Sequence, residues 1–168
     1  MPQIEVLARF HDRKSFDCGE SALNDYLKET ARQHVEKGIS KTFVLIDPNM
    51  PKEILGYYTL ASCEVVTSNL PADIAKKYPT RVPAAKLARL TVLRGQQRKG
   101  FGGVMMADAM KRILAIADNI GVVGFFVDAK NQPAKEYYEQ YGFIPLPNNP
   151  LELFLPLATL RKAVEAAG

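Results

Sequence analysis

The sequence predicts an α/β (α+β) fold, with a central mixed, twisted sheet of about six to seven strands flanked by helices. Three observations lead to this prediction. Apolar stretches of strand length alternate with amphipathic stretches of helix length through the second half of the chain, which is typical of a sheet covered by helices. The 168 residues suit one domain over residues 1–168, and 47% hydrophobic residues are enough for a buried core. No internal repeat or linker-like stretch divides the chain.

The first half of the chain predicts strands on both sides of one helix. Leu23, Tyr26 and Leu27 have helical spacing behind a turn that begins at Phe16, and Gly38 is a suitable C-terminal stop. A turn rich in Pro and Asn separates the second and third strands. We expect strands at 3–10, 41–47 and 54–66 and the helix within 16–38.

The second half predicts a strand–turn–helix–strand unit. Residues 122–129 are apolar nearly throughout, which indicates a central strand buried on both faces. The right-handed crossover rule makes the strands on either side of the unit's helix parallel neighbours. We expect strands at 85–93, 122–129 and 151–157, helices at 102–118 and 132–142, a short helix within 69–79 and a short helix at the C-terminus.

Composition and charge restrict the class of protein. No apolar run reaches the length that spans a membrane, and the N-terminus lacks the features of a signal peptide. The two cysteines, Cys18 and Cys63, are too few for a disulfide framework, so we expect reduced thiols in a cytoplasmic protein. The net charge of +4 is compatible with a polyanion such as RNA or with an anionic cofactor, and equally with ordinary surface charge.

A glycine-rich turn precedes the helix at 102–118. The stretch GQQRKGFGG begins with the spacing of a P-loop, but Phe101 and Gly102 replace the lysine and the hydroxyl residue that bind phosphate and magnesium. A dinucleotide fingerprint fails as well, because Met105 stands where its third glycine belongs. The backbone N–H groups at the helix start nevertheless suit an anion. An anion site and a plain turn with solvated cations stay equally open on this evidence.

Two motifs lie in the second half of the chain. The first is Gln97-Arg98-Lys99-Gly100-Phe101-Gly102, and the second is NQPAKEYYEQYGF at 131–143. They resemble the [Q/R]-x-x-G-x-[G/A] and N-x-x-A-x-x-x-Y-x-x-x-G-F patterns of the GCN5-related N-acetyltransferases, the GNAT family, with Tyr138 in register. The resemblance covers nearly the whole chain and implies the GNAT fold, in which the sheet splays between its two parallel central strands.

A narrower resemblance rests on FDCGESALNDYLKETARQ near the start, GYYTLAS, ARLTV and the ending FLPL. It is a resemblance to the GNAT-type toxins of bacterial toxin–antitoxin pairs. It implies an enzyme that acetylates the amino group of aminoacyl-tRNA and so blocks translation. It also implies a ribbon-helix-helix antitoxin as partner, contact with operator DNA through that antitoxin only, and a homodimer.

The GNAT resemblance implies that the anion at the glycine turn is the pyrophosphate of acetyl-CoA, which needs no metal ion. The pantetheine arm is expected between the strands at 85–93 and 122–129, with the N–H of Val92 polarising the thioester carbonyl. Asn131 is expected to bind the cofactor, and it suits equally well the N-cap of the following helix. The expected cofactor-binding residues are Leu90, Thr91, Val92, Gln97, Arg98, Lys99, Gly100, Phe101, Gly102, Gly103 and Asn131.

Tyr138 is the catalytic residue that the resemblance implies, as the proton donor to the departing CoA thiolate. Phenol and thiol have ordinary pKa values of about 10 and about 8.5. Helical spacing cannot select one tyrosine, because Tyr137 and Tyr141 lie on the same arc; Tyr137 is the alternative and Tyr141 suits the core. Neither His11 nor His34 has a partner at ligand spacing, so we assign them no metal or catalytic role.

No residue stands out in the sequence as a general base. Glu64 is a candidate, but a single glutamate on a strand is more often a surface residue than a base. An α-amino group has a pKa of about 8 and is partly neutral in the cell, whereas lysine at about 10.4 is not. The missing base therefore weakly favours an aminoacyl acceptor, with water as the proton acceptor.

Basic residues in or next to the strand that is expected to bind the cofactor are candidates to contact tRNA. Arg89 is the strongest of them, because it adjoins the expected reaction centre, and Lys86 and Arg94 are further candidates. Other cations suit a phosphate track or a solvated surface: Arg32, Lys37, Lys76, Lys77 and Arg81.

Two other functions stay open on the sequence. The first is a GNAT enzyme that acetylates a small amine, a peptide N-terminus or a protein lysine and has no toxin role. The second is a GNAT fold kept as a binding module without activity. The intact glycine turn and Tyr138 disfavour this second function, because a scaffold needs neither.

Overall fold

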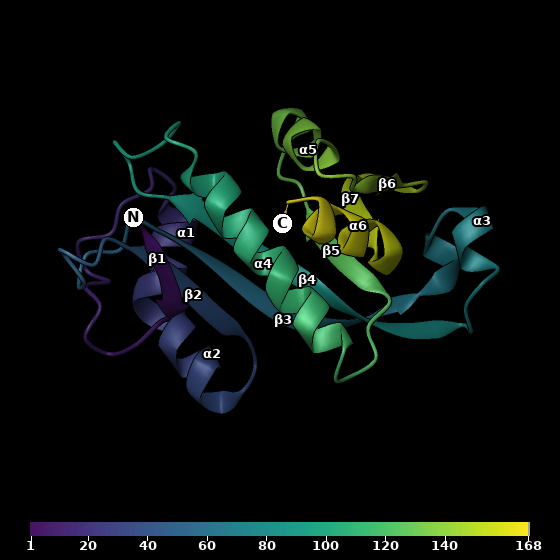
Figure 1. Ribbon diagram of the computed structural model, residues 1–168, viewed down its shortest axis with the longest axis horizontal. Helices are drawn as coiled ribbons and strands as arrows, with labels where there is room; N and C mark the ends of the chain where they lie inside the picture. The colour runs from purple at the N-terminus through teal and green to yellow at the C-terminus, as the bar shows by residue number, and fades with distance from the viewer. Residues whose placement is uncertain (168) are drawn as a thin grey trace. The chain divides into compact units, whose positions relative to one another are not determined.

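The computed structural model describes residues 1–167, and its strands form a seven-stranded mixed sheet in the order β1-β2-β3-β4-β5-β7-β6. Figure 1 labels the strands and most of the helices. Internal contacts divide the chain into two compact units, and each is described by itself below. The first unit holds Met1–Ala61 and Ala88–Ala109, and the second holds Ser62–Leu87 and the chain from Met110 on. Strands β3 and β4 and helix α4 contribute residues to both units.

The first unit is built on antiparallel strands. Strand β1 (Gln3–Val6) pairs with β2 (Lys41–Ile46), and β2 pairs with the first half of β3 (Gly56–Val66). Side chains alternate between the two faces of the strands. Val44 and Tyr57, which are partners in the register, therefore face one way, and Phe43 and Tyr58 face the other.

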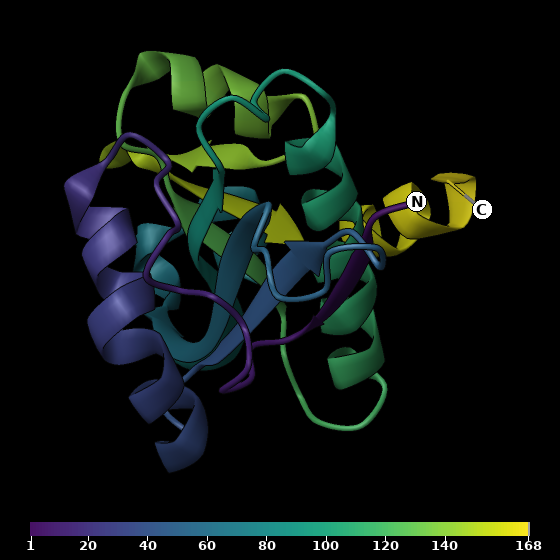
Figure 2. The ribbon, with the colours of Figure 1, turned by 90° about the vertical axis from the view of Figure 1, so that its left-hand side faces the viewer.

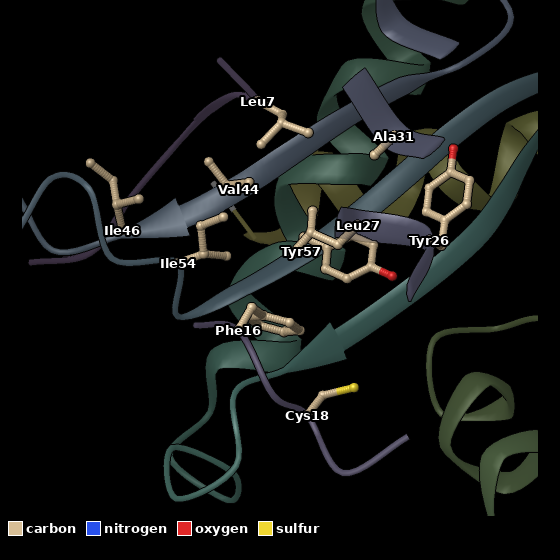
Figure 3. Close-up of a cluster of buried hydrophobic side chains, with 10 residues drawn as sticks. All are labelled: Leu7, Phe16, Cys18, Tyr26, Leu27, Ala31, Val44, Ile46, Ile54 and Tyr57. Atoms are coloured by element: carbon tan, nitrogen blue, oxygen red, sulfur yellow. The ribbon is translucent and has the colours of Figure 1, made fainter. Parts of the chain in front are cut away.

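One helical segment covers the first of these faces. It consists of α1 (Ser21–Asp25), a π-helical turn η1 (Tyr26–Thr30) and α2 (Ala31–Lys37). In Figure 2 this segment runs continuously along one side of β2 and β3, and the start of α4 lies on the other side. Its buried side chains join Val44 and Tyr57 in the cluster of Figure 3, which comprises Leu7, Phe16, Cys18, Tyr26, Leu27, Ala31, Val44, Ile46, Ile54 and Tyr57.

The helical segment ends as the sequence predicts. Gly38 adopts the left-handed conformation with φ 73°, and the N–H of Ile39 donates to the carbonyl of His34. On the opposite face, the Tyr58 hydroxyl donates to the Asp108 carboxylate of α4 (Phe101–Ala117), while Phe43 stacks on Tyr58.

The second unit contains the parallel step of the sheet. Ala85–Leu87 of β4 (Arg81–Val92) pairs in parallel with Phe125–Val127 of β5 (Gly124–Asp128), which confirms the predicted parallel neighbours. Strand β5 pairs antiparallel with β7 (Asn149–Pro156), and β7 pairs with β6 (Ile144–Leu146).

Helices cover both faces of the strands in the second unit. Four of the five residues of β5 are buried, as the apolar run predicts. Phe126 and Phe154 pack in a cluster with side chains of α3 (Ala72–Ala75), which follows the 3₁₀ turn η2 (Thr67–Asn69). Helix α6 (Leu157–Ala167) contacts β5 and β7, and α5 (Gln132–Glu139) contacts β7.

Four details of the predicted elements are wrong. Strand 3–10 ends at Val6, because the chain turns back to form hydrogen bonds between His11 and Ala8. The helix within 16–38 is interrupted by a π turn, β4 begins four residues earlier than predicted, and β6 was not predicted at all. The single domain over residues 1–168 stays a prediction.

Candidate functional site

The glycine-rich turn joins the end of β4 to the start of α4. Gly95 and Gly100 have φ angles of 88° and 82°, and Arg98 lies in the same left-handed region with φ 66°. This conformation costs glycine little and other residues more, which explains two of the glycines. A Cβ atom added to Gly95 or Gly100 would meet no heavy atom within 4 Å, so the turn borders open space.

The turn presents positive charge and free donors. The first N–H groups of an α-helix have no acceptor within the helix, and α4 begins at Phe101. The positive end of the helix dipole lies at the same place. Arg98 and Lys99 are exposed, and the Lys99 ammonium donates to Gln96 Oε1 at 3.0 Å. This combination fits a phosphate group.

Hydrogen bonds fasten the turn to the segment before α1. The Arg94 N–H donates to the Asp17 carbonyl at 2.8 Å. The Gln97 side chain donates to the carbonyls of Cys18 and Val92, each at 3.2 Å. The amide of Gln97 therefore shapes the turn, which leaves only its backbone for the predicted cofactor contact.

The other predicted cofactor residues of β4 lie just before the turn. Leu90, Thr91 and Val92 are half-buried and lie beyond Ala85–Leu87, the stretch that pairs with β5. Phe101 and Gln96 of the turn are among the residues that line a cavity of about 340 Å³.

Tyr138 differs from the nearby Tyr137 and Tyr141 in the hydrogen bonding of its hydroxyl group. The hydroxyls of Tyr137 and Tyr141 lie 3.2 Å apart and pair with each other. Within the described residues of its unit, the Tyr138 hydroxyl has no hydrogen-bond partner. The Tyr138 ring makes edge contacts with Tyr137 and Phe143, with centroids 5.4 and 5.8 Å apart. Burial raises the pKa of Tyr138 to about 12, and nearby Tyr141 adds to the increase.

Asn131 acts as the N-cap of α5. Its side-chain oxygen accepts the Ala134 N–H at 3.0 Å, which confirms one of the two roles predicted for it. Its N-cap conformation is fully extended, and Pro133 follows in the first turn, where it costs no hydrogen bond.

Arg89 packs against an aromatic ring rather than against a carboxylate. Its guanidinium carbon lies 3.5 Å from the centroid of the Tyr26 ring, in η1. The Tyr26 hydroxyl lies 3.2 Å from His34 Nδ1 and 3.1 Å from Ser40 Oγ. Sequence reasoning missed Tyr26 as a partner of Arg89, because 63 positions separate them and no local pattern links them.

The other candidate cations have carboxylate partners. Lys86 Nζ lies 2.7 Å from Asp128 Oδ2, and this hydrogen bond raises the lysine pKa. The Arg94 guanidinium lies 3.7 Å from Asp17 Oδ2, at an exposed position. Two of the other cations predicted for a track are paired as well, in the exposed ion pairs Arg32–Glu36 and Arg81–Glu64.

The remaining polar residues form structural contacts. Glu64 binds Arg81 at an exposed site. His11 is buried, lies 2.7 Å from Glu5 Oε1 and accepts the Ala8 N–H. Among residues 1–167, no three His, Cys, Asp or Glu side chains are grouped closely enough to hold a metal ion. No helix in the same stretch has the length and apolar character to cross a membrane.

Comparison with known proteins gives full-length matches. The family described as acetyltransferase (GNAT) domain matches residues 17–153. The "tRNA-acetylating toxin" of Mycobacterium tuberculosis (strain ATCC 25618 / H37Rv) is 33% identical over 153 residues, which are 91% of this chain and 90% of that protein. The "probable toxin TacT" of Sinorhizobium fredii (strain NBRC 101917 / NGR234) is 29% identical over 160 residues, which are 90% of this chain and 88% of that protein.

Solved structures match the fold over the same length. AtaT complexed with acetyl-methionyl-tRNAfMet has a TM-score of 0.89 and 32% identity, and covers 96% of this chain and 98% of that one. A tyrosine-to-phenylalanine mutant of AtaT, bound to the C-terminus of antitoxin AtaR and to acetyl-CoA, has a TM-score of 0.80 and 30% identity, with coverages of 96% and 97%. The KacTA–DNA complex has a TM-score of 0.83 and 29% identity, with 99% of both chains covered.

Proposed function

The chain belongs to the GNAT acetyltransferase family, and from this premise we propose that it transfers the acetyl group of acetyl-CoA to the amino group of aminoacyl-tRNA. Its physiological role is then that of a translation-blocking toxin. The observation that carries the proposal is the match to a tRNA-acetylating toxin at 33% identity over about nine-tenths of both chains.

The glycine turn supports the cofactor part of the proposal. Acetyl-CoA supplies an activated acetyl thioester and a pyrophosphate that needs cationic and N–H donors. Gly100, Gly102 and Gly103 keep the backbone at the start of α4 accessible, and Arg98 and Lys99 add charge. The backbone N–H of Val92 polarises the thioester carbonyl, and Leu90 and Thr91 offer backbone groups to the pantetheine arm.

Tyr138 supports the chemical step. The hydroxyls of Tyr137 and Tyr141 pair with each other, and the Tyr138 hydroxyl pairs with neither of them. A phenol is protonated at neutral pH at its ordinary pKa of about 10, and the raised pKa of Tyr138 leaves this unchanged. A neutral phenol is able to donate its proton to a departing thiolate. Asn131, whose oxygen caps α5, keeps its amide N–H donors for the cofactor.

The surroundings of Glu64 give weak support to an α-amino group as the acceptor. Glu64, the carboxylate considered as base, is held by Arg81 at an exposed site. An α-amino group is partly neutral at cellular pH and attacks without a strong base, with water as the proton acceptor. The ester-linked amino acid of charged tRNA carries such an amine.

The partners follow from the same proposal. The matched AtaT structure with the C-terminus of AtaR suggests an antitoxin for this chain, and we propose that it is of the ribbon-helix-helix class. The KacTA–DNA complex supports contact with operator DNA through that antitoxin. We also propose a homodimer, and a cytoplasmic location where charged tRNA is found.

A labelling experiment tests the proposed function. Purified protein is mixed with radiolabelled acetyl-CoA and a total pool of charged tRNA, with deacylated tRNA as the control. Label in the RNA fraction is counted before and after mild alkaline cleavage of the aminoacyl ester.

The expected result is label that appears only with charged tRNA and leaves with the amino acid. Label on a small amine, a peptide N-terminus or a protein lysine, with none on charged tRNA, overturns the toxin function and leaves an acetyltransferase with another acceptor. No transfer to any amine contradicts enzymatic activity altogether.

A further inference from the structure

The Arg89 guanidinium is held in place by an aromatic face. It lies 3.5 Å from the ring centroid of Tyr26, whose side chain is 7% exposed, while Arg89 is half-buried. A cation at this distance over a tyrosine ring is attracted by the ring's negative face. Both groups belong to the first unit, and the Tyr26 ring lies in its hydrophobic cluster (Figure 3).

The Tyr26 ring is in turn fixed at its far end. Its hydroxyl bonds to His34 and to the buried Ser40, at 3.2 and 3.1 Å. Tyr26 and His34 are eight residues apart, which in a regular α-helix leaves them about 80° apart around the axis. The π turn Tyr26–Thr30 takes up one extra residue, so that eight residues complete about two turns. The π turn therefore brings His34 onto the face of Tyr26.

This mode of anchoring holds Arg89 through an aromatic ring in place of a carboxylate. Lys86 and Arg94 have carboxylate partners, whereas no carboxylate pairs with Arg89 among the described residues of its unit. Arg89 also lowers the pKa of the nearby Tyr57 phenol, against the larger effect of burial. A guanidinium stacked by its face keeps its N–H donors at the edge, in the planar fork that matches two phosphate oxygens.

We propose that Arg89 binds a backbone phosphate of the single-stranded acceptor end of charged tRNA, and that Tyr26 is a positioning residue that acts through Arg89. The proposal rests on the proposed function. Arg89 adjoins Leu90–Val92, the stretch proposed to hold the pantetheine arm, so a phosphate at Arg89 places the acceptor end beside the thioester.

The experiment compares variants that keep or remove the ring. Tyr26→Phe keeps the aromatic face, and Tyr26→Leu and Tyr26→Met remove it. We expect the two ringless variants to raise the KM for charged tRNA about tenfold relative to Tyr26→Phe, with the KM for acetyl-CoA unchanged. The ring is buried, so the melting temperatures of the ringless variants fall, and all variants are assayed below these temperatures with saturating acetyl-CoA. Two ringless side chains are used so that a folding defect in one does not end the test.

A double-mutant cycle separates positioning from structure. Arg89→Ala is expected to raise the KM for charged tRNA at least as much as the ringless variants. If Tyr26 acts through Arg89, Tyr26→Leu adds little to Arg89→Ala, whereas independent effects multiply. Direct binding of charged tRNA without acetyl-CoA, measured against salt, is expected to show a log–log slope shallower by about 0.7 in Arg89→Ala, the value for one phosphate contact on a single strand.

The outcomes separate this proposal from the proposed function. Any of three results overturns the role of the pair, even if the wild type acetylates charged tRNA. These are multiplicative effects of the two substitutions on the KM for charged tRNA, a salt slope that Arg89→Ala leaves unchanged, and a ringless variant that behaves like Tyr26→Phe. Salt-dependent binding through Arg89 without acetylation supports the pair and overturns the proposed function. Absence of binding by the wild type overturns both.

Discussion

Tyr137 and Tyr138 are adjacent in α5, yet their hydroxyl groups have different surroundings. Tyr137 and Tyr141 satisfy each other, and the Tyr138 hydroxyl has no partner in the described part of its unit. Burial raises the pKa of both phenols. The difference between them therefore lies in hydrogen bonding, and it makes Tyr138 the residue whose proton is available.

We predict that Tyr138→Phe binds acetyl-CoA like the wild type and loses turnover by about 100-fold or more, the usual contribution of a general acid. Steady-state kinetics and isothermal titration with acetyl-CoA measure the two properties. Tyr137→Phe is the matched control, because it removes a hydroxyl one position away in the same helix, and we expect it to keep most of the activity. Equal turnover of Tyr138→Phe and the wild type would remove Tyr138 from the mechanism.

The raised pKa of Tyr138 also predicts a pH dependence of stability. Below pH 10, the ordinary pKa of tyrosine, the phenol is neutral in both the folded and the unfolded chain. Its full contribution to the free energy of unfolding is therefore present there. Between pH 10 and 12 the unfolded chain ionises first, and the free energy of unfolding falls. We expect urea unfolding to show a loss from pH 9 to 11 that is about 1 kcal/mol smaller in Tyr138→Phe than in the wild type. Identical pH profiles for the two proteins contradict the buried phenol.

The sequence predicts roles that depend on neighbouring residues, and it does not predict contacts between residues far apart in the chain. The N-cap role of Asn131 follows from its place before a helix that begins with Gln-Pro, and the structure confirms it. The choice between Tyr137 and Tyr138 does not follow from helical spacing, since both lie on one arc. The contact of Arg89 with Tyr26 joins β4 to the π turn η1, and no spacing rule covers such a contact.

At the scale of elements, the turn before α4 gives a test with an internal control. Gly95 and Gly100 both have positive φ, and both border open space. Alanine at either position costs about 1 kcal/mol of backbone strain. Only Gly100 directly precedes the N–H groups proposed to hold the pyrophosphate, because α4 begins at Phe101.

We predict that Gly100→Ala weakens acetyl-CoA binding about tenfold, while Gly95→Ala has a similar effect on stability and little effect on affinity. Chemical unfolding and titration calorimetry on the two variants provide the comparison. Equal affinities for the two variants count against an anion site at the helix start.

Element prediction succeeded where one pattern dominated. The apolar run of β5 and the Gly38 stop of the first helical segment are clear signals. Strand β6 has only three residues with a proline among them, which leaves no periodicity to detect. The π turn was not predictable, because no residue pattern in Tyr26–Thr30 separates it from a regular helical turn.

At the scale of the whole molecule, a ligand that binds only the folded chain stabilises it by mass action. Acetyl-CoA at 100 times its dissociation constant adds about 2.7 kcal/mol. For a chain of this size we predict a rise in melting temperature of about 5–10 °C. S-acetylpantetheine, which lacks the pyrophosphate, is the matched control and should give a smaller shift at the same concentration. No shift with acetyl-CoA would support a fold kept without its cofactor.

The π turn between α1 and α2 has a consequence for how this chain tolerates change. Substitutions at its exposed positions, such as Glu29, alter surface chemistry and leave the backbone path intact. Deletion of one residue there restores a regular helix, in which the seven residues that then lead from Tyr26 to His34 span about 700°, close to two full turns. His34 therefore stays on the face of Tyr26, and Ala31 stays in the buried cluster. Natural variation in this segment is expected to include the loss of this one residue as well as exchanges of side chains, whereas insertion of a further residue would rotate everything beyond it by about 100°.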